Sequence, residues 1–285
     1  MESLKISAAA LLLVITASVT HAQSTGPSWK RSESRSTPAL QLFHANHAIN
    51  LPTATMLRRQ TFEFEIAHRF FPTIESGHEV LFGLDGPAAI RFALTYGVSD
   101  RLAVTLGRSN LNDNVDLSIK GRVFELASSS LPVLVGVQAG TGWNTEVLGL
   151  SDTDSRAFQF YFRAMINTMF AKRLALGLVP AYLYNTNVRS ADTEEIITLG
   201  VIAQYYVSPL LSLMAEWDPS LGGDDYLHDP VSWGIELETG GHFFKLAVSN
   251  STRLNPSQYI AGSDDPAGGR YWHLGFSITR LLKFW

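Results

Sequence analysis

Charged side chains recur at alternate positions in several stretches of this sequence, and the positions between them are mostly apolar. Successive side chains of an extended strand point to opposite faces, so these charges share one face. Isolated charges are costly away from water, so they must either pair or line an aqueous path. The basic members are Arg91, Lys120, Arg122, Arg163 and Lys245; Asp116, Glu216, Glu236 and Glu238 are the acidic ones, joined by Glu63 and Glu65, and His273 shares the polar face of the last stretch.

Two other groups of residues suggest hydrolytic chemistry, which requires a serine or aspartate held beside a histidine. They are His228 with Asp229, and His273 with Ser249 or Ser251 on the preceding predicted strand. The chain contains neither a Gly-x-Ser-x-Gly nor a His-Glu-x-x-His pattern. We therefore expect no enzyme, with a lipid hydrolase as the less favoured alternative.

Metal and nucleic-acid chemistry find little support in the composition. His44 and His47 have a spacing that suits a metal on a helical turn, but no carboxylate accompanies them, so we expect neither a metal nor a cofactor. The chain has 0 cysteines, which excludes disulfides and cysteine-ligated metals. A net charge of −4 without a basic cluster argues against nucleic acid as a partner.

The end of the chain indicates which elements position the charges. Residues 270–285 alternate apolar with small or polar side chains and finish at Phe284-Trp285, which a membrane-facing strand accommodates better than a soluble surface does. Arg280 falls on the apolar face. It must either extend to the membrane interface or be shifted by a bulge at Leu281-Leu282.

From Thr61 onward we count twelve candidate strands, with no helical periodicity of useful length. Residues 173–184 and 195–207 are apolar on both faces in places, so their register stays open. Short links alternate with long ones along the chain, as in membrane barrels. The sequence therefore predicts an all-β, antiparallel, up-and-down transmembrane β-barrel of about 12 strands (10–14). Its interior is either a narrow pore for small polar solutes or a closed, salt-bridged filling.

The N-terminal region predicts export. Residues 1–22 contain an early lysine, an apolar run and a small residue at the end, as a cleavable signal peptide does. We assign residues 23–59 to a periplasmic lead, whose later part could form a short strand or tuck against the barrel, and residues 60–285 to the barrel. The expected location is the outer membrane of a Gram-negative bacterium. The expected partners are outer-membrane lipid, with small polar solutes or a periplasmic protein as further candidates.

One connection stands out because its apolar residues Phe82 and Leu84 lie within a predicted loop that ends at Asp85-Gly86-Pro87. It could fold into the barrel mouth and constrict it, with Asp85 meeting an inward arginine such as Arg91. It could instead pack on its neighbours as an ordinary apolar loop, which is the interpretation that we favour.

Several short motifs resemble the DUF5777 family of β-barrel proteins from Bacteroidota, over nearly the whole length from about Leu42 to the end of the chain. The resemblance implies an outer-membrane barrel of undefined activity, and no catalytic or ligand residue is transferred from it. The motifs are His68-Arg69-Phe70, Leu81-Phe82-Gly83-Leu84-Asp85-Gly86, Tyr96-Gly97-Val98-Ser99-Asp100-Arg101-Leu102, Glu238-Thr239-Gly240-Gly241-His242 and His273-Leu274-Gly275-Phe276.

Overall fold

The computed structural model describes residues 40–147, 149–223 and 227–283. The predicted signal peptide and the first part of the predicted lead lie outside these residues. The strands are β1 (Phe62–Thr73), β2 (Ala88–Ser99), β3 (Leu102–Ser109), β4 (Asn114–Leu126), β5 (Val133–Asn144), β6 (Phe158–Phe170), β7 (Leu174–Tyr184), β8 (Glu195–Tyr206), β9 (Leu211–Trp217), β10 (Ser220–Gly223), β11 (Val231–Glu238), β12 (His242–Ser249) and β13 (His273–Leu282). The helical segments are η1 (Ile74–Ser76), η2 (His78–Gly83), η3 (Leu111–Asp113), η4 (Ser155–Ala157) and α2 (Pro256–Ile260).

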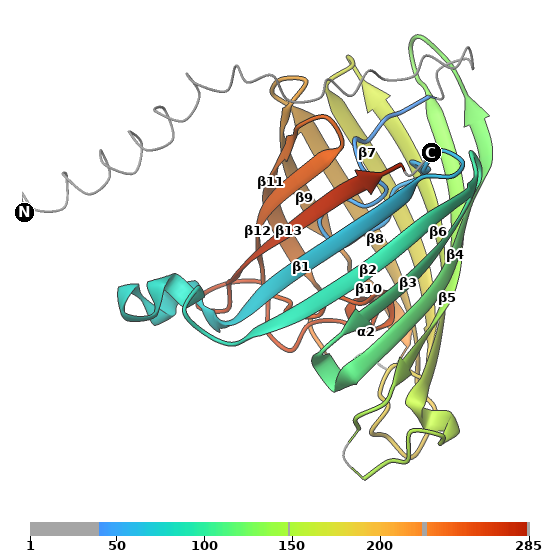
Figure 1. Cartoon of the computed structure of the whole chain (residues 1–285). Helices are drawn as coiled ribbons and strands as arrows, with labels where there is room; N and C mark the ends of the chain where they lie inside the picture. The colour runs from blue at the N-terminus through green and yellow to red at the C-terminus, as the bar shows by residue number, and fades with distance from the viewer. Residues whose placement is uncertain (1–39, 148, 224–226, 284–285) are drawn as a thin grey trace, which may run out of the picture. The chain divides into compact units, whose positions relative to one another are not determined.

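The strands form one closed antiparallel barrel (Figure 1). Apart from the short strand β10, consecutive strands of the chain pair with each other, and β1 pairs with both β2 and β13, which closes the sheet. The short strand β10 follows β9 and pairs with β8, as β9 does, so the two occupy one staggered position. The barrel therefore has twelve strands, and the predicted fold class is confirmed.

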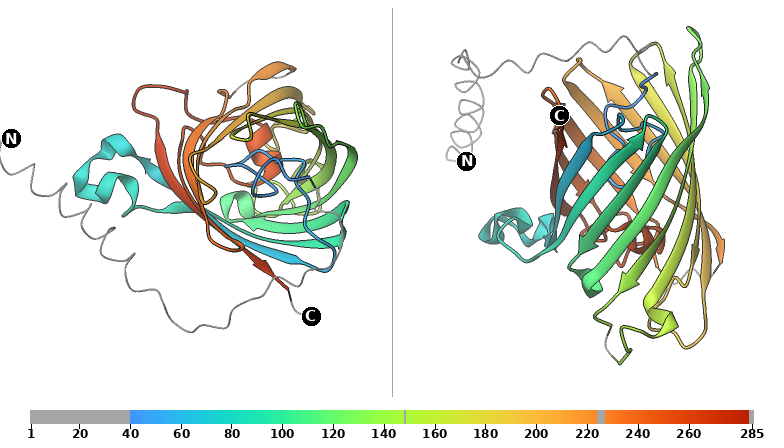
Figure 2. Two further views of the ribbon diagram at one scale, coloured as in Figure 1. Left: turned by 90° about the horizontal axis from the view of Figure 1, so that it is seen from above. Right: turned by 45° about the vertical axis from the view of Figure 1, so that its right-hand side comes forward.

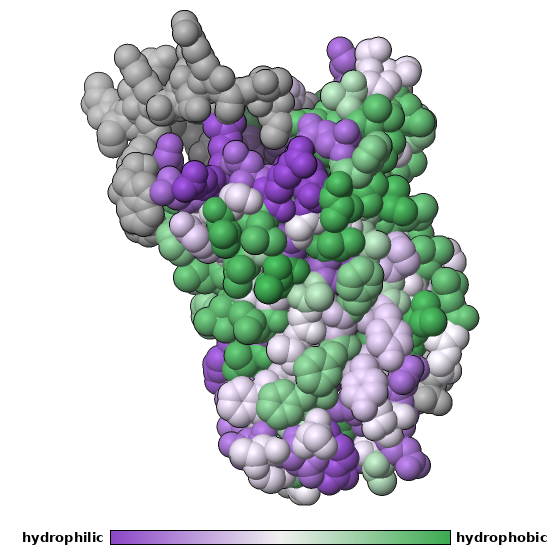
Figure 3. Space-filling model, turned by 90° about the vertical axis from the view of Figure 1, so that its right-hand side faces the viewer, coloured by the Kyte–Doolittle hydropathy of each residue, from purple (hydrophilic) through white to green (hydrophobic). Residues whose placement is uncertain are grey.

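Alternating polarity explains why these residues form barrel strands. On β4, Leu117 and Ile119 are about half exposed on the outside, whereas Asp116, Ser118 and Lys120 are buried inside. Figure 3 shows apolar side chains gathered over the outer side of the strands. Such a surface is stable only against another apolar phase, which for a barrel is lipid.

The connections differ in length at the two ends. The links β2–β3, β6–β7 and β11–β12 take two or three residues, and the last of these uses Gly240 and Gly241 at φ 65° and 99°, where the backbone requires left-handed conformations. We call this the short-turn end. The opposite, long-loop end carries residues 74–87, 145–157, 185–194 and 250–272. This asymmetry agrees with the predicted alternation of link lengths.

The interior is filled from both ends (Figure 2). Residues 40–59, the later part of the predicted periplasmic lead, run inside the barrel and join β1 at the short-turn end, where Gln60 N donates to Gly97 O. We call this segment the plug. From the long-loop end, residues 250–272 fold inward and bury α2 against β5, β6 and β7. We call this segment the cap loop.

The last strand differs from one predicted detail. Pairing of β13 with β1 runs without a shift from Leu282↔Phe62 to Gly275↔Arg69, so no bulge occurs at Leu281-Leu282. Arg280 stays on the outer face, exposed, within two residues of the strand end, where its long side chain can reach polar surroundings. None of the described helices is long and apolar enough to cross a membrane.

Candidate functional site: the plugged barrel interior

The plug is a tight hairpin whose tip consists of residues 48–51. Ala48 N donates to Leu51 O at 2.9 Å, and Thr53 N donates to Asn46 O at 2.9 Å. The Thr53 hydroxyl braces the two arms by donating to Ala45 O at 2.8 Å. These bonds satisfy only part of the plug backbone, and the barrel wall must supply the rest.

Glu216 on β9 holds the tip of the plug. Its Oε1 accepts hydrogen bonds from Ile49 N at 2.6 Å and Leu51 N at 3.0 Å. Its Oε2 accepts from Asn50 N at 2.9 Å and from Asn50 Nδ2 at 3.1 Å. The residue is 2% exposed, so this carboxylate replaces its hydration shell entirely with plug donors.

Two lysines hold carbonyl groups of the plug from other directions. Lys120 Nζ donates to the carbonyl oxygens of Asn46, Thr53 and Thr55 at 3.0, 3.2 and 2.8 Å. Lys245 Nζ donates to His47 O at 2.8 Å and lies 3.7 Å from Glu236 Oε2. Both lysines are buried. An ammonium has three donors and no acceptor, so each is matched to a cluster of carbonyls.

Acidic groups of the wall meet polar side chains of the plug. His44 Nδ1 lies 3.0 Å from Glu236 Oε1, and His47 Nε2 lies 3.2 Å from Glu65 Oε1. Burial and the nearby Lys245 lower the pKa of His47 below its usual range, so this imidazole is neutral near pH 7. The two histidines, whose spacing could have suited a metal, thus lie against two different carboxylates of the wall. The described residues contain no group of three or more potential metal ligands.

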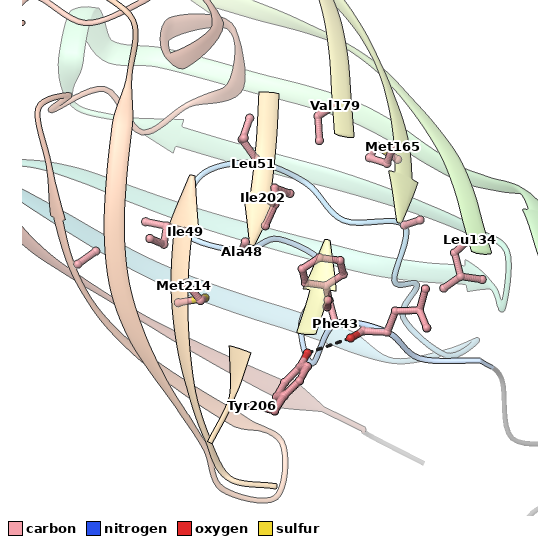
Figure 4. Packing of buried hydrophobic residues seen from close by; sticks show 14 of the residues in the cluster. Phe43, Ala48, Ile49, Leu51, Leu134, Met165, Val179, Ile202, Tyr206 and Met214 are labelled. Carbon is pink, nitrogen blue, oxygen red and sulfur yellow. Dashed lines mark hydrogen bonds between the residues drawn. The ribbon is translucent and has the colours of Figure 1, made fainter. Parts of the chain in front are cut away.

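The plug also packs on apolar side chains of the barrel (Figure 4). Phe43, Ala48, Ile49 and Leu51 form a buried cluster with side chains of β5 to β9. Tyr206 combines both kinds of contact, since its hydroxyl donates to Leu42 O at 3.0 Å. The wall members of the cluster are Leu134, Met165, Ala175, Val179, Ile202, Tyr206 and Met214, with Ala247 from β12.

One member of the predicted charge set, Arg91, binds the cap loop, and Asp116 and Arg163 contact side chains of neighbouring strands. Arg91 binds Glu65 and donates from Nε to Asn255 Oδ1 at 2.8 Å. Asp116 accepts from the Tyr161 hydroxyl at 2.8 Å. Arg163 donates from Nη2 to Gln138 at 2.9 Å and lies over the ring of Tyr161.

The remaining predicted residues lie nearer the two rims. Arg122 pairs with Glu125 at 2.8 Å, and Glu238 is only partly buried and accepts from Gly241 N in the adjacent turn. At the long-loop end, both ring nitrogens of His273 are engaged, with Asp265 Oδ2 and Phe70 O, each at 3.0 Å.

The proposed mouth constriction is wrong. The segment with η1 and η2 projects sideways from the long-loop end (Figure 1). Phe82 and Leu84 are each 49% exposed, and Asp85 is also exposed. Arg91 is held inside by Glu65 and Asn255, so it does not meet Asp85. Gly83 lies so close to the carbonyl of Pro72 that a Cβ at this position would be 2.5 Å from the oxygen.

The histidine and serine pairs considered for catalysis are also placed by the structure. Ser249 lies opposite His273 in the β12–β13 register, but its hydroxyl accepts a hydrogen bond from Ser232 at 2.8 Å. His228 forms a backbone bridge with Ser263. In the structure, Ser249 therefore bonds to the neighbouring strand β11, and His228 joins its loop to Ser263 of the cap loop.

Several interior residues were missed by the sequence reasoning. Arg69 shares the parity of Glu63 and Glu65 on β1, so alternation alone could have placed it inside. Alternation also places Asn167 on the inner face, with Arg163, but it does not predict that Asn167 Oδ1 accepts from Ala54 N of the plug at 2.5 Å. The plug itself was missed because its mixture of apolar and polar residues has no strand or helix period.

Known proteins give a fold-level comparison. The chain is similar to the NanC porin (TM-score 0.45, 8% identity, 79% of this chain and 100% of that chain). It is also similar to an outer membrane channel from Pseudomonas putida F1 (0.49, 12%, 80% and 98%) and to the outer membrane phospholipase A from Escherichia coli (0.43, 9%, 81% and 95%). No curated protein matches the sequence.

A family model agrees with the architecture described above. It matches residues 43–282, a span that includes most of the plug and every strand of the barrel. The chain belongs to the DUF5777 family, described as a membrane bound beta barrel domain.

Proposed function

We propose that this protein is a gated channel for small polar solutes in the outer membrane of a Gram-negative bacterium, and that the plug is its gate. A signal peptide at residues 1–22 would deliver it there, with the short-turn end facing the periplasm. The proposal assigns the protein no catalytic step. Its interior charges serve to hold the plug when the barrel is closed and to contact water and solutes when the plug moves.

The observation that carries this proposal is the way in which Glu216 binds the tip of the plug. A filling that is never removed is stabilised as well or better by apolar side chains, because burying charges gives little net stability. Here, Glu216, Lys120 and Lys245 instead bind plug backbone through groups that water can solvate equally well. Releasing the plug therefore exchanges hydrogen bonds with protein for hydrogen bonds with water, which costs about 1.5–3 kcal/mol for each bond to a charged group instead of the about 4–6 kcal/mol of a bond broken without replacement.

A closed structural barrel, which could also anchor a partner, is the second candidate. It is favoured by the apolar cluster around Phe43 and Leu51, because exposing such side chains to water is unfavourable. The two candidates differ in one measurable property. A channel conducts solutes when the plug is loosened, whereas a structural barrel does not.

Swelling of proteoliposomes in solutions of amino acids and sugars of graded size tests the proposal. The test variant is Lys120→Met with Lys245→Met, which frees five carbonyl contacts of the plug. The matched control is Lys172→Met, because this lysine is exposed in the β6–β7 turn. We expect the wild type to admit small solutes slowly, the double variant to admit them faster, and the control to match the wild type. If all three match protein-free liposomes, the channel proposal fails.

A further inference from the structure

A cavity of about 80 Å³ lies inside the barrel, between the tip of the plug and the cap loop. Asn50 of the plug and Leu254 and Pro256 of the cap loop contribute to its lining, and strands β1 to β6 and β12 supply most of the rest. By its share of liquid volume, water occupies about 30 Å³ per molecule, so the space corresponds to two or three waters.

Two arginines that line this cavity have unused donors. Arg69 donates from Nη2 to Asn50 Oδ1 at 3.2 Å, and Arg163 donates from Nη2 to Gln138 Oε1 at 2.9 Å. Both acceptors are neutral amides. The Nε and Nη1 atoms of each guanidinium are buried and have no hydrogen-bond partner among the described residues.

Neither arginine is held by a carboxylate at ion-pair distance. Arg69 is 3% exposed and Arg163 is 2% exposed, and neither forms an ion pair of 4.0 Å or less with a described carboxylate. Glu216 acts on Arg69, and Asp116 and Asp218 act on Arg163, only from farther away. A buried cation without a directly bonded counter-ion is costly, so an anion at this position would be bound favourably.

The side chains around the cavity also carry a net positive charge. Five cationic side chains line it, against the two carboxylates of Glu63 and Glu65. Glu65 is bound by Arg91 and lies 3.2 Å from His47 Nε2, and Glu63 accepts from Asn46 Nδ2 at 2.6 Å. Lys120 and Lys245 already donate to plug carbonyls, which leaves Arg69 and Arg163 as the cations with free donors.

We propose that this cavity binds a small monocarboxylate, of the size of acetate, through Arg69 and Arg163. Guanidinium groups bind carboxylates through short, charge-assisted hydrogen bonds. Ala67, Ala247 and Leu254 give the lining an apolar part that suits a short alkyl group better than the fully polar surface of phosphate. The site belongs to the plugged barrel, so it exists whether or not the protein conducts solutes.

Titration of the folded full chain in detergent micelles, followed by ligand-detected NMR at constant ionic strength, tests this assignment. The ligands are acetate, its neutral analogue acetamide, and phosphate. The variants are Arg69→Gln and Arg163→Gln, with Arg173→Gln as the control, because Arg173 is an exposed arginine at the short-turn end. Arg69→Lys and Arg163→Lys accompany them and keep the charge if a glutamine variant fails to fold.

We expect saturable binding of one acetate per chain, and binding of acetamide at least about tenfold weaker, since the charge is lost. Each glutamine variant should bind acetate at least about tenfold more weakly, each lysine variant should be intermediate, and Arg173→Gln should match the wild type. The assignment is overturned if the wild type shows no saturable acetate binding or binds acetamide equally well. It is also overturned if the arginine variants bind as the wild type does, or if phosphate binds where acetate does not.

Discussion

Replacing Glu216 with glutamine should release the tip of the plug with little change in side-chain volume. The carboxylate accepts through two oxygens, whereas glutamine keeps one acceptor and places an NH₂ donor where the other oxygen was. If the amide oxygen takes the place of Oε1, Asn50 N keeps its 3.0 Å bond to that position, but the bond from Asn50 Nδ2 is lost. The new NH₂ group then faces the Nδ2 donor of Asn50 without an acceptor between them.

The size of the effect follows from these contacts. One lost hydrogen bond to a charged acceptor costs about 1.5–3 kcal/mol, and leaving buried donors unpaired costs about 1–3 kcal/mol more, which gives about 2.5–6 kcal/mol. Part of this loss is offset because the variant no longer buries a charge, which leaves about 2–4 kcal/mol against the closed state. The equilibrium between seated and released plug should then shift by about 30-fold to several-hundred-fold toward release.

Single-channel recording in planar bilayers measures this shift as the fraction of time spent open. Glu238→Gln is the matched control, because Glu238 sits at the rim and contacts only the adjacent turn. We expect frequent, long openings for Glu216→Gln and wild-type behaviour for the control. Folding of Glu216→Gln is judged by heat-modifiable gel mobility. If the folded variant gives the same current trace as the wild type, Glu216 does not hold the plug closed.

Three further perturbations follow from individual contacts. Gly200→Val should loosen the plug and raise conductance, because even a Cβ at this position would lie 2.8 Å from Leu51 Cδ1, and overpacking costs about 1–3 kcal/mol. Tyr206→Phe should lower the thermal unfolding midpoint in detergent, since it leaves two backbone groups of the plug unpaired at about 1–3 kcal/mol each. Phe82→Ser with Leu84→Ser should leave conductance unchanged, because these exposed side chains lie outside the mouth; a changed current would contradict that placement.

The sequence predicted the barrel well because its lipid-facing side chains alternate with small or polar ones on most strands. Register stayed open only on β7 and β8, and the structure gives the reason. Ala175, Val179 and Ile202 point inward yet are apolar, because they pack against the plug. An apolar interior on one wall removes the contrast between faces that the alternation argument needs.

The alternation of side chains predicted which charged residues face the interior, but it did not predict which residues they contact. Contacts such as Glu216 with Ile49 join residues 167 positions apart, and the plug residues form no regular element that a period would reveal. The inward arginine expected to meet Asp85 instead meets Glu65, because a strand neighbour is nearer than a loop that turns outward.

A reversible disulfide between the plug and the barrel wall tests most directly the claim that the plug is a gate. The chain has 0 cysteines, and the Cβ of Ala54 lies 3.5 Å from the position of a Cβ at residue 136, within the separation of about 3.5–4.5 Å that a disulfide requires. The matched control is the single variant Gly136→Cys, because a Cβ at residue 136 would also lie 2.8 Å from Met165 Cε and 3.1 Å from Gly121 O. The double variant Ala54→Cys with Gly136→Cys, recorded in planar bilayers, should stay closed when oxidised and should open as often as this control once dithiothreitol is added. Equal currents before and after reduction, with the disulfide verified by mass spectrometry, would contradict a gate formed by residues 40–59.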